Sequence, residues 1–81
     1  MEKKIQMPKL SPEMKKGVLV AWLKAPGDAV KKGDILFEVE TEKVVSEVEA
    51  GEDGVLRSVY FEEGDEVAAD ETVAILETNH G

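Results

Sequence analysis

Hydrophobic and polar residues alternate with a period of two over much of this chain. The alternation is clearest at 35–40 and 44–50, where aliphatic and acidic residues take turns, as they do in a strand with one buried and one solvated face. Three further segments, 18–23, 55–61 and 72–76, have the length and β-branched composition of strands. Gly-Asp turn signals separate these segments, and none shows a helical stripe. The pattern therefore predicts an all-β domain.

The second half of the chain repeats the first at an offset of 37 residues. Gly17-Val18-Leu19 falls on Gly54-Val55-Leu56 (54 − 17 = 37), and Gly27-Asp28 falls on Gly64-Asp65 in the same register. Turn glycines and strand valines that match together indicate two half-domains of similar build rather than coincidence among common residues. The expected fold is an all-β sandwich or flattened barrel with approximate twofold symmetry.

The repeat also predicts where the chain ends lie. Position 43 maps onto positions 6 and 80 (43 − 37 and 43 + 37), which are close to the two termini. A twofold axis therefore places a turn at Lys43 at one pole of the molecule and both termini at the other. We take residues 1–78 as the domain and 79–81 as a tail or the start of a linker.

Composition excludes several classes of site and partner. The 81 residues suffice for one small domain, and without cysteine there is no disulfide framework, thiolate metal site or cysteine nucleophile. The single histidine, His80, stands next to the C-terminal residue, which excludes a histidine metal cluster or a catalytic triad. Eighteen acidic and ten basic residues give a net charge of −8, which disfavours nucleic acid and anionic membranes as partners.

The sequence predicts neither a membrane span nor a secretion signal. The longest strictly apolar run, Val18–Leu23, is far shorter than the roughly 20 residues that cross a bilayer. Met1–Lys4 is charged and has no apolar stretch behind it, unlike a signal peptide. We expect a monomeric domain in the cytoplasm of a bacterial or archaeal cell, with the mitochondrial matrix as the alternative.

A two-residue turn at Glu42-Lys43 joins the two clearest strands. It predicts 37/48 and 35/50 as pairs on the core face, 38/47 and 36/49 as pairs on the wet face, and 40/45 and 39/46 nearer the turn. Tight hairpin turns favour Asn-Gly or Gly-X, so Glu-Lys suits this turn poorly and something besides turn stability selects it. On spacing alone, however, Lys43 also fits an ordinary surface lysine.

Several motifs share the pattern of one known family. They are Pro8-Lys9-Leu10-Ser11-Pro12-Glu13-Met14, Gly17, Trp22, Gly27-Asp28, Gly33-Asp34 and Glu40-Thr41-Glu42-Lys43. Over about residues 4–78 the chain resembles the lipoyl domains of dihydrolipoyl acyltransferase components of 2-oxo acid dehydrogenase complexes. The resemblance implies a flattened β-barrel of two four-stranded antiparallel sheets, with the modified lysine on a hairpin turn opposite the termini.

The resemblance also implies a site and a role. Lipoic acid would be attached to Lys43 through an amide, and no residue of the domain would be catalytic or bind a metal. The residues expected to form and support the recognition turn are Glu40, Thr41, Glu42 and Val44, with Gly27 and Gly54 behind them. Glu42 stands where the family usually has aspartate, and Val44 where it often has a small residue.

The implied partners are the enzymes of an acyl-transfer cycle. A lipoate-protein ligase or lipoyl transferase would attach the group, a thiamin-diphosphate 2-oxo acid decarboxylase would acylate it reductively, an acyltransferase core would pass the acyl group to coenzyme A, and dihydrolipoyl dehydrogenase would reoxidise it. The loop expected to recognise the decarboxylase comprises Leu10, Ser11, Pro12, Glu13, Met14, Lys15 and Lys16. Its Leu-Ser-Pro-x-Met form resembles pyruvate-type and acetoin-type complexes, although a plain connecting loop is the alternative.

Other functions fit the sequence less well. A biotin carrier shares the hairpin lysine, but methionine typically flanks that lysine on both sides, whereas Glu42 and Val44 stand here. An unmodified interaction module has no need of the Glu40–Lys43 motif, and the glycine-cleavage carrier is a longer protein. An enzyme in its own right is disfavoured because no cleft motif organises the many acidic residues.

Overall fold

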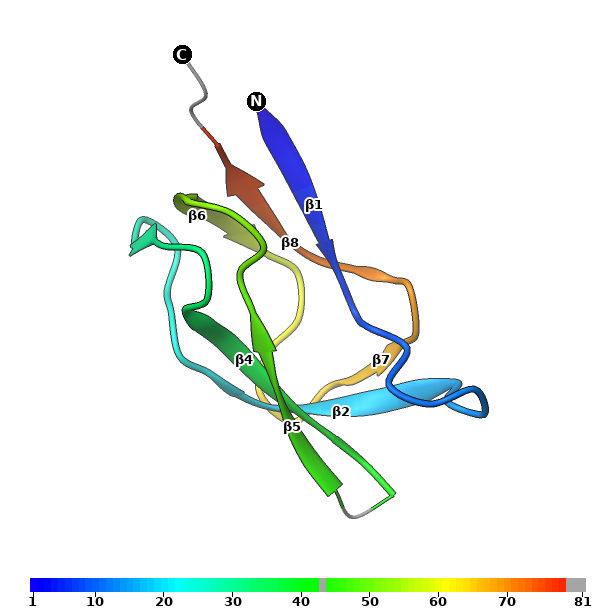
Figure 1. Cartoon of the computed structure of the whole chain (residues 1–81). Helices are drawn as coiled ribbons and strands as arrows, with labels where there is room; N and C mark the ends of the chain where they lie inside the picture. Colours follow the sequence, from blue (N-terminus) through cyan, green and yellow to red (C-terminus); the bar gives the residue numbers. More distant parts are fainter. Residues whose placement is uncertain (43, 79–81) are drawn as a thin grey trace.

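The computed structural model describes residues 1–42 and 44–78, and these residues form strands, turns and loops without a helix (Figure 1). The strands are β1 (Glu2–Gln6), β2 (Lys16–Trp22), β3 (Ala29–Val30), β4 (Ile35–Thr41), β5 (Val44–Glu49), β6 (Gly54–Val59), β7 (Glu66–Ala68) and β8 (Thr72–Glu77). The segment 55–61 ends as a strand at Val59, two residues earlier than expected. The two- and three-residue strands β3 and β7 are too short to show a period in the sequence.

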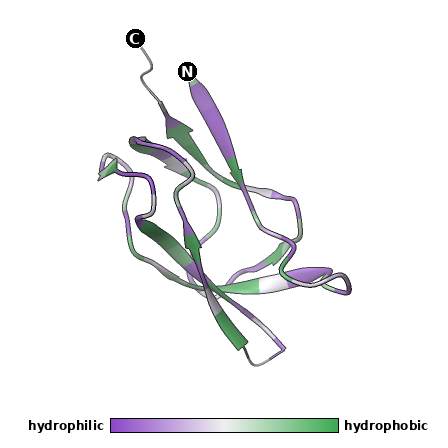
Figure 2. Ribbon diagram, viewed as in Figure 1, coloured by the Kyte–Doolittle hydropathy of each residue, from purple (hydrophilic) through white to green (hydrophobic). Residues whose placement is uncertain are grey.

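The eight strands form two antiparallel sheets of four strands each. One sheet has the order β1-β8-β6-β3 and the other β5-β4-β2-β7, which confirms the expected fold class. Apolar side chains from both sheets and from the connecting loops fill the core. The largest of those that are fully buried are Met7, Leu19, Leu36, Phe37, Val39, Leu56, Val67 and Val73. Edge strand β1 is hydrophilic over most of its length (Figure 2), which protects an exposed sheet edge from pairing with other chains.

The internal repeat is present in the detail of the strand pairing. A bulge interrupts β2 against β4 between Leu19 and Ala21, and its counterpart interrupts β6 against β8 between Leu56 and Ser58. The amide of Gly27 donates to the Leu56 carbonyl at 2.7 Å, and that of Gly64 donates to the Leu19 carbonyl at 2.7 Å. Equivalent residues are 37 apart in each case, which confirms the approximate twofold relation.

The two poles of the molecule lie where the repeat predicts. The start of β1 and the end of β8 meet at one pole, where the Thr78 amide donates to the Met1 carbonyl at 2.8 Å. The β4–β5 hairpin lies at the opposite pole (Figure 1). The pair Thr41–Val44 closes that hairpin as Thr78 and Met1 close the other pole. Lys43 and His80 are outside the described residues.

The pairing of β4 with β5 departs from expectation at its far end. The pairs 40/45, 39/46, 38/47 and 37/48 are confirmed, and the predicted pairs 36/49 and 35/50 are wrong. A bulge between Ile35 and Phe37 inserts Leu36, so Ile35 rather than Leu36 lies opposite Glu49. Leu36 is only 1% exposed instead of lying on the wet face. The bulge allows two consecutive large residues, Leu36 and Phe37, to enter the core.

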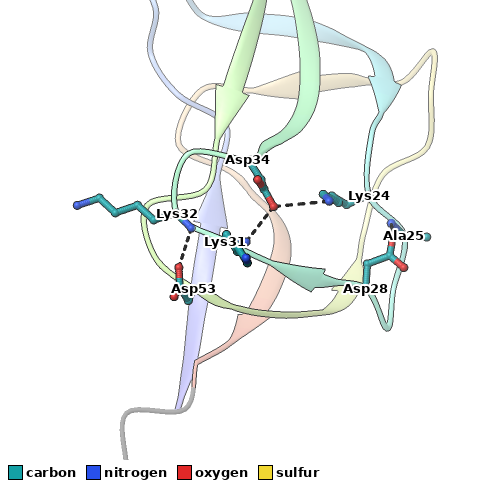
Figure 3. A network of polar contacts seen from close by, with 7 residues as sticks. All are labelled: Lys24, Ala25, Asp28, Lys31, Lys32, Asp34 and Asp53. Atoms are coloured by element: carbon teal, nitrogen blue, oxygen red, sulfur yellow. Dashed lines mark hydrogen bonds and ion pairs between the residues drawn. The ribbon is translucent and has the colours of Figure 1, made fainter.

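Short acidic residues stabilise the turns between strands. The carboxylate of Asp34 accepts a hydrogen bond from the Lys31 amide at 2.9 Å and lies 3.6 Å from Lys24 Nζ (Figure 3). The Lys31 hydrogen bond is the main reason why the pKa of Asp34 is lowered from its ordinary value, and Lys24 adds to the effect. Asp28 accepts from the Ala25 amide at 2.8 Å in the same way. Each carboxylate thus closes the tight turn in which it lies.

Candidate functional site

The hairpin between β4 and β5 has strained backbone next to its apex. Glu42 has a φ of +47°, in the left-handed region that residues other than glycine adopt at a cost of about 1–2 kcal/mol. The sequence interpretation that Glu-Lys suits this turn poorly agrees with that strain. Strain of this kind at a non-glycine residue is common at functional sites. Lys43 follows Glu42 directly and lies outside the described residues.

Residues on both sides of position 43 are exposed to solvent, Glu40 and Glu42 before it and Val44 and Val45 after it. Val44 is 60% exposed, Val45 is also exposed, and the start of β5 is the hydrophobic end of the hairpin in Figure 2. On the outer face, Glu40 lies opposite Val45 and Glu38 lies opposite Glu47. Like charges placed directly opposite destabilise a sheet by a few tenths of a kcal/mol. The hairpin is therefore a projecting, acidic element with apolar residues at its tip.

The loop between β1 and β2 packs against the inner side of the hairpin. Between loop and hairpin lies a hollow of about 430 Å³, and its lining residues are Leu10, Ser11, Glu13, Met14, Lys15, Lys16, Thr41, Glu42, Val44 and Ser46. Six of the seven loop residues expected to recognise a partner line this hollow, and Pro12 does not. Three of the four residues expected to form the turn, Thr41, Glu42 and Val44, line the same hollow. Glu40 points instead to the outer face of the sheet, opposite Val45.

Met14 anchors this loop to the body of the domain. Its side chain is buried in the core, its amide donates to the Ser11 carbonyl at 3.1 Å, and its Sδ accepts a hydrogen bond from the Leu10 amide at 3.2 Å. Leu10 in contrast is 41% exposed. The loop is therefore an ordered surface that presents an apolar side chain beside the hairpin.

The glycine that lies beneath the hairpin is Gly17, to which the sequence analysis assigned no role at the site. A Cβ at Gly17 would lie 2.6 Å from Val39 Cγ2 and 3.2 Å from both Met14 Cε and Thr41 Cγ2. Only a glycine lets β2 approach β4 and the loop so closely. The sequence did contain a sign that Gly17 matters, because Gly17 and Gly54 are matching glycines in the 37-residue repeat.

Gly27 and Gly54 do not support the turn as expected. Gly27 has a φ of +97° and donates to Leu56 in the other sheet. Gly54 begins β6, also in the other sheet, where an added Cβ would collide with the backbone carbonyl of Glu77. Both glycines serve the fold away from the hairpin, and Gly54 is the counterpart of Gly17 at the opposite pole.

The described residues contain no candidate metal site. Among residues 1–42 and 44–78 no group of three or more His, Cys, Asp or Glu side chains can hold a metal ion. No helix in this part of the chain is long and apolar enough to cross a membrane. Lys43 stands in the sequence between Glu42 and Val44, and both of these neighbours are exposed.

Comparison with known proteins places this geometry in a family. The Biotin_lipoyl family model, described as "Biotin-requiring enzyme", matches residues 3–77. The acetyltransferase component of the pyruvate dehydrogenase complex from Zymomonas mobilis is 42% identical over 73 residues, which cover 89% of this chain and 17% of that protein. The succinyltransferase component of the 2-oxoglutarate dehydrogenase complex from Cupriavidus necator is 42% identical over 74 residues, covering 91% and 18%. The chain thus spans less than a fifth of these relatives.

Solved structures agree with the sequence comparison. The lipoyl domain of the 2-oxoglutarate dehydrogenase complex from Azotobacter vinelandii has a TM-score of 0.78 and 36% identity, covering 96% of this chain and 98% of that one. The Kluyveromyces lactis urea carboxylase also has a TM-score of 0.78, but at 24% identity and over 94% of this chain and 6% of that one, which shows the fold alone. The chain therefore belongs to the Biotin_lipoyl family and is a lipoyl domain of the kind found in dihydrolipoyl acyltransferase components of 2-oxo acid dehydrogenase complexes.

Proposed function

We propose that Lys43 carries lipoic acid through an amide and that the domain moves acyl groups between the active sites of a 2-oxo acid dehydrogenase complex. The observation that carries the proposal is the β4–β5 hairpin, which projects at the pole opposite Met1 and Thr78 with exposed residues on both sides of Lys43. A carrier that visits several enzymes needs its attachment point outside any pocket. A linker at the opposite pole leaves the hairpin free to enter each active site.

The protein and the attached group have separate tasks. When bound, lipoate supplies a dithiolane that takes up an acyl group as it is reduced and releases that group to coenzyme A. The chain presents Lys43 between the exposed residues Glu42 and Val44, and amide formation removes the positive charge of Lys43. Tethering keeps the arm at a local concentration of roughly millimolar at each active site. In this proposal the domain has no catalytic residue of its own.

Lipoate is favoured over biotin by the residues beside Lys43 and by the relatives. Glu42 and Val44 stand where biotin carriers typically have methionine. The relatives reported above, at 42% identity, are dihydrolipoyllysine acyltransferase components. The urea carboxylase and a long-chain acyl-CoA carboxylase share the fold at 24% and 15% identity, and identities this low show the fold without showing which group is carried.

We further propose that the loop of residues 10–16 selects the decarboxylase. The carried group is chemically the same in every such complex, so discrimination comes from the protein surface beside it, and this loop packs against the hairpin. Pyruvate-type and 2-oxoglutarate-type relatives are equally similar overall, both at 42% identity. The Leu-Ser-Pro-x-Met form of the loop favours pyruvate or acetoin as the substrate.

Reductive acylation of the lipoylated domain tests this function. Purified decarboxylases for pyruvate, acetoin, 2-oxoglutarate and branched-chain acids are each offered the domain, and transfer of the acyl group is followed by intact mass. The pyruvate or acetoin enzyme should acylate it fastest, and a foreign sequence at 11–16 should slow acylation without slowing lipoylation. Acylation by none of the enzymes would contradict the carrier function, and equal rates with either loop would remove the recognition role alone.

A further inference from the structure

We propose that the hollow between the hairpin and the 10–16 loop binds the apolar end of the group on Lys43 whenever no enzyme holds it. The domain then has two states, one with the dithiolane ring resting on Leu10, Met14 and Val44 and one with the arm extended. This inference rests on the proposed function, because it requires a lipoyl group on Lys43. The ligand of the hollow is then the lipoyl group on the same chain rather than a separate molecule.

Position is the first argument. Glu42 and Val44, the two neighbours of Lys43, both line the hollow, so a group attached to Lys43 starts at its edge. Binding of a tethered group is intramolecular, and an affinity in the millimolar range is enough for substantial occupancy. A small apolar contact surface within a mixed lining, too weak to capture free lipoate, therefore suffices for the attached form.

The chemistry of the lining is the second argument. Leu10 and Val44 are 41% and 60% exposed in a chain of which 35% is charged, and the buried Met14 side chain lines the same hollow. A five-carbon chain ending in a disulfide ring is apolar and polarisable, as are aliphatic and thioether side chains. The other seven lining residues are polar or charged, so an apolar ring has only the side chains of Leu10, Met14 and Val44 to rest on. Those seven residues are Ser11, Glu13, Lys15, Lys16, Thr41, Glu42 and Ser46.

The internal repeat supplies the third argument. Met7 and Ala50 are equivalent positions. The Met7 amide donates to the Glu71 carbonyl and the Ala50 amide donates to the Asp34 carbonyl, each at 2.8 Å, and the two acceptors are 37 residues apart (71 − 34). From Met7 to Gly17 the chain takes ten steps (17 − 7), but from Ala50 to Gly54 only four (54 − 50). The same connection is thus six residues longer where it faces the Lys43 hairpin.

The equivalent connection in the other half is closed without six such residues. The bulges, turns and hydrogen bonds recur in both halves, and the shorter connection joins its strands equally well. The additional length brings Leu10 and Met14 to the inner side of the hairpin, and no such loop stands at the pole formed by Met1 and Thr78 in the described structure. Since an enzyme that contacts the 10–16 loop would cover the hollow, docking and release of the ring are coupled.

Methyl NMR on the intact domain tests the binding site without any enzyme activity. Intact mass first establishes that the sample is lipoylated, and absence of modification would contradict the proposed function rather than this inference. In the lipoylated domain we expect the methyl signals of Leu10, Met14 and Val44 to move relative to the unmodified domain, with nuclear Overhauser effects to the dithiolane protons. Unchanged shifts and no such effects in a fully lipoylated sample would overturn the inference.

Chemical access to the ring gives an independent measurement with a matched control. A water-soluble phosphine should reduce the dithiolane about threefold faster in Leu10→Ser than in the wild type, the factor expected if the ring rests in the hollow about two thirds of the time. Leu23→Ser removes a leucine of similar exposure (51%) beyond the other end of β2 and should leave the rate unchanged. Equal rates in the wild type and both variants would overturn the inference.

Discussion

Replacement of Gly17 by alanine tests the close packing beneath the hairpin. The added Cβ would lie 2.6 Å from Val39 Cγ2, about 1 Å inside the usual contact distance between carbon atoms. Val39 is fully buried and β-branched, so it has few rotamers with which to move away. Overpacking of this kind lowers the free energy of unfolding by about 1–3 kcal/mol. Alanine has less conformational freedom than glycine in the unfolded chain, which offsets about 0.4–1 kcal/mol of that loss.

The net expectation is that Gly17→Ala lowers the free energy of unfolding by about 1–2 kcal/mol. For a domain of this size each kcal/mol lowers Tm by about 4–8 °C. Urea unfolding followed by the fluorescence of Trp22, whose ring is 5.0 Å from that of Phe37, measures the change directly. Tm from circular dichroism gives a second value.

Gly51→Ala is the matched control for this experiment. A Cβ at Gly51 meets no atom within 4 Å, so this variant should be neutral or up to about 1 kcal/mol more stable than the wild type. If the two alanine variants unfold within about 0.3 kcal/mol of each other, the hairpin does not depend on close packing at Gly17 and the reasoning is refuted.

Two further substitutions test the turns. Because the Lys31 hydrogen bond lowers the pKa of Asp34 below its ordinary 3.8, the Asp34 carboxylate contributes stability above that pH, and the contribution is lost as pH falls through the lowered value. Asp34→Asn should thus unfold more easily than the wild type at pH 7, with the difference shrinking in acid; a difference independent of pH in urea titrations would contradict this. Glu42→Gly should stabilise the domain by about 1 kcal/mol in thermal unfolding, because glycine adopts positive φ freely; a destabilised variant would show that Glu42 is not strained.

The sequence was sufficient for the fold class because its signals agree at several levels. Period-two alternation and glycine turns predict an all-β fold, the 37-residue repeat predicts its two halves and its two poles, and the family resemblance implies the two four-stranded sheets. The pairing at Leu36 was not predictable, because a bulge depends on how Leu36 and Phe37 both reach the core. Strands β3 and β7 were missed since two or three residues carry no measurable period.

The site was predictable in its residues but not in its packing. The motif Glu40–Lys43 and the loop 10–16 were both recognisable from the sequence, and the structure brings that loop and the hairpin together around one hollow. The role of Gly17 depends on the distance between β2 and β4, which no local pattern encodes. Gly27 and Gly54 were assigned to the turn by resemblance, whereas their hydrogen bonds and contacts place them elsewhere.

The central claim is that Lys43 carries lipoic acid, and fragment mass spectrometry tests it most directly. The domain is incubated in parallel with a lipoyl ligase and lipoate and with a biotin ligase and biotin, and the modified peptide is sequenced by fragmentation. We predict one lipoyl group on Lys43, none on Lys43→Gln, and no biotin on either protein. Lipoate on another lysine, or biotin in place of lipoate on Lys43, would contradict the account.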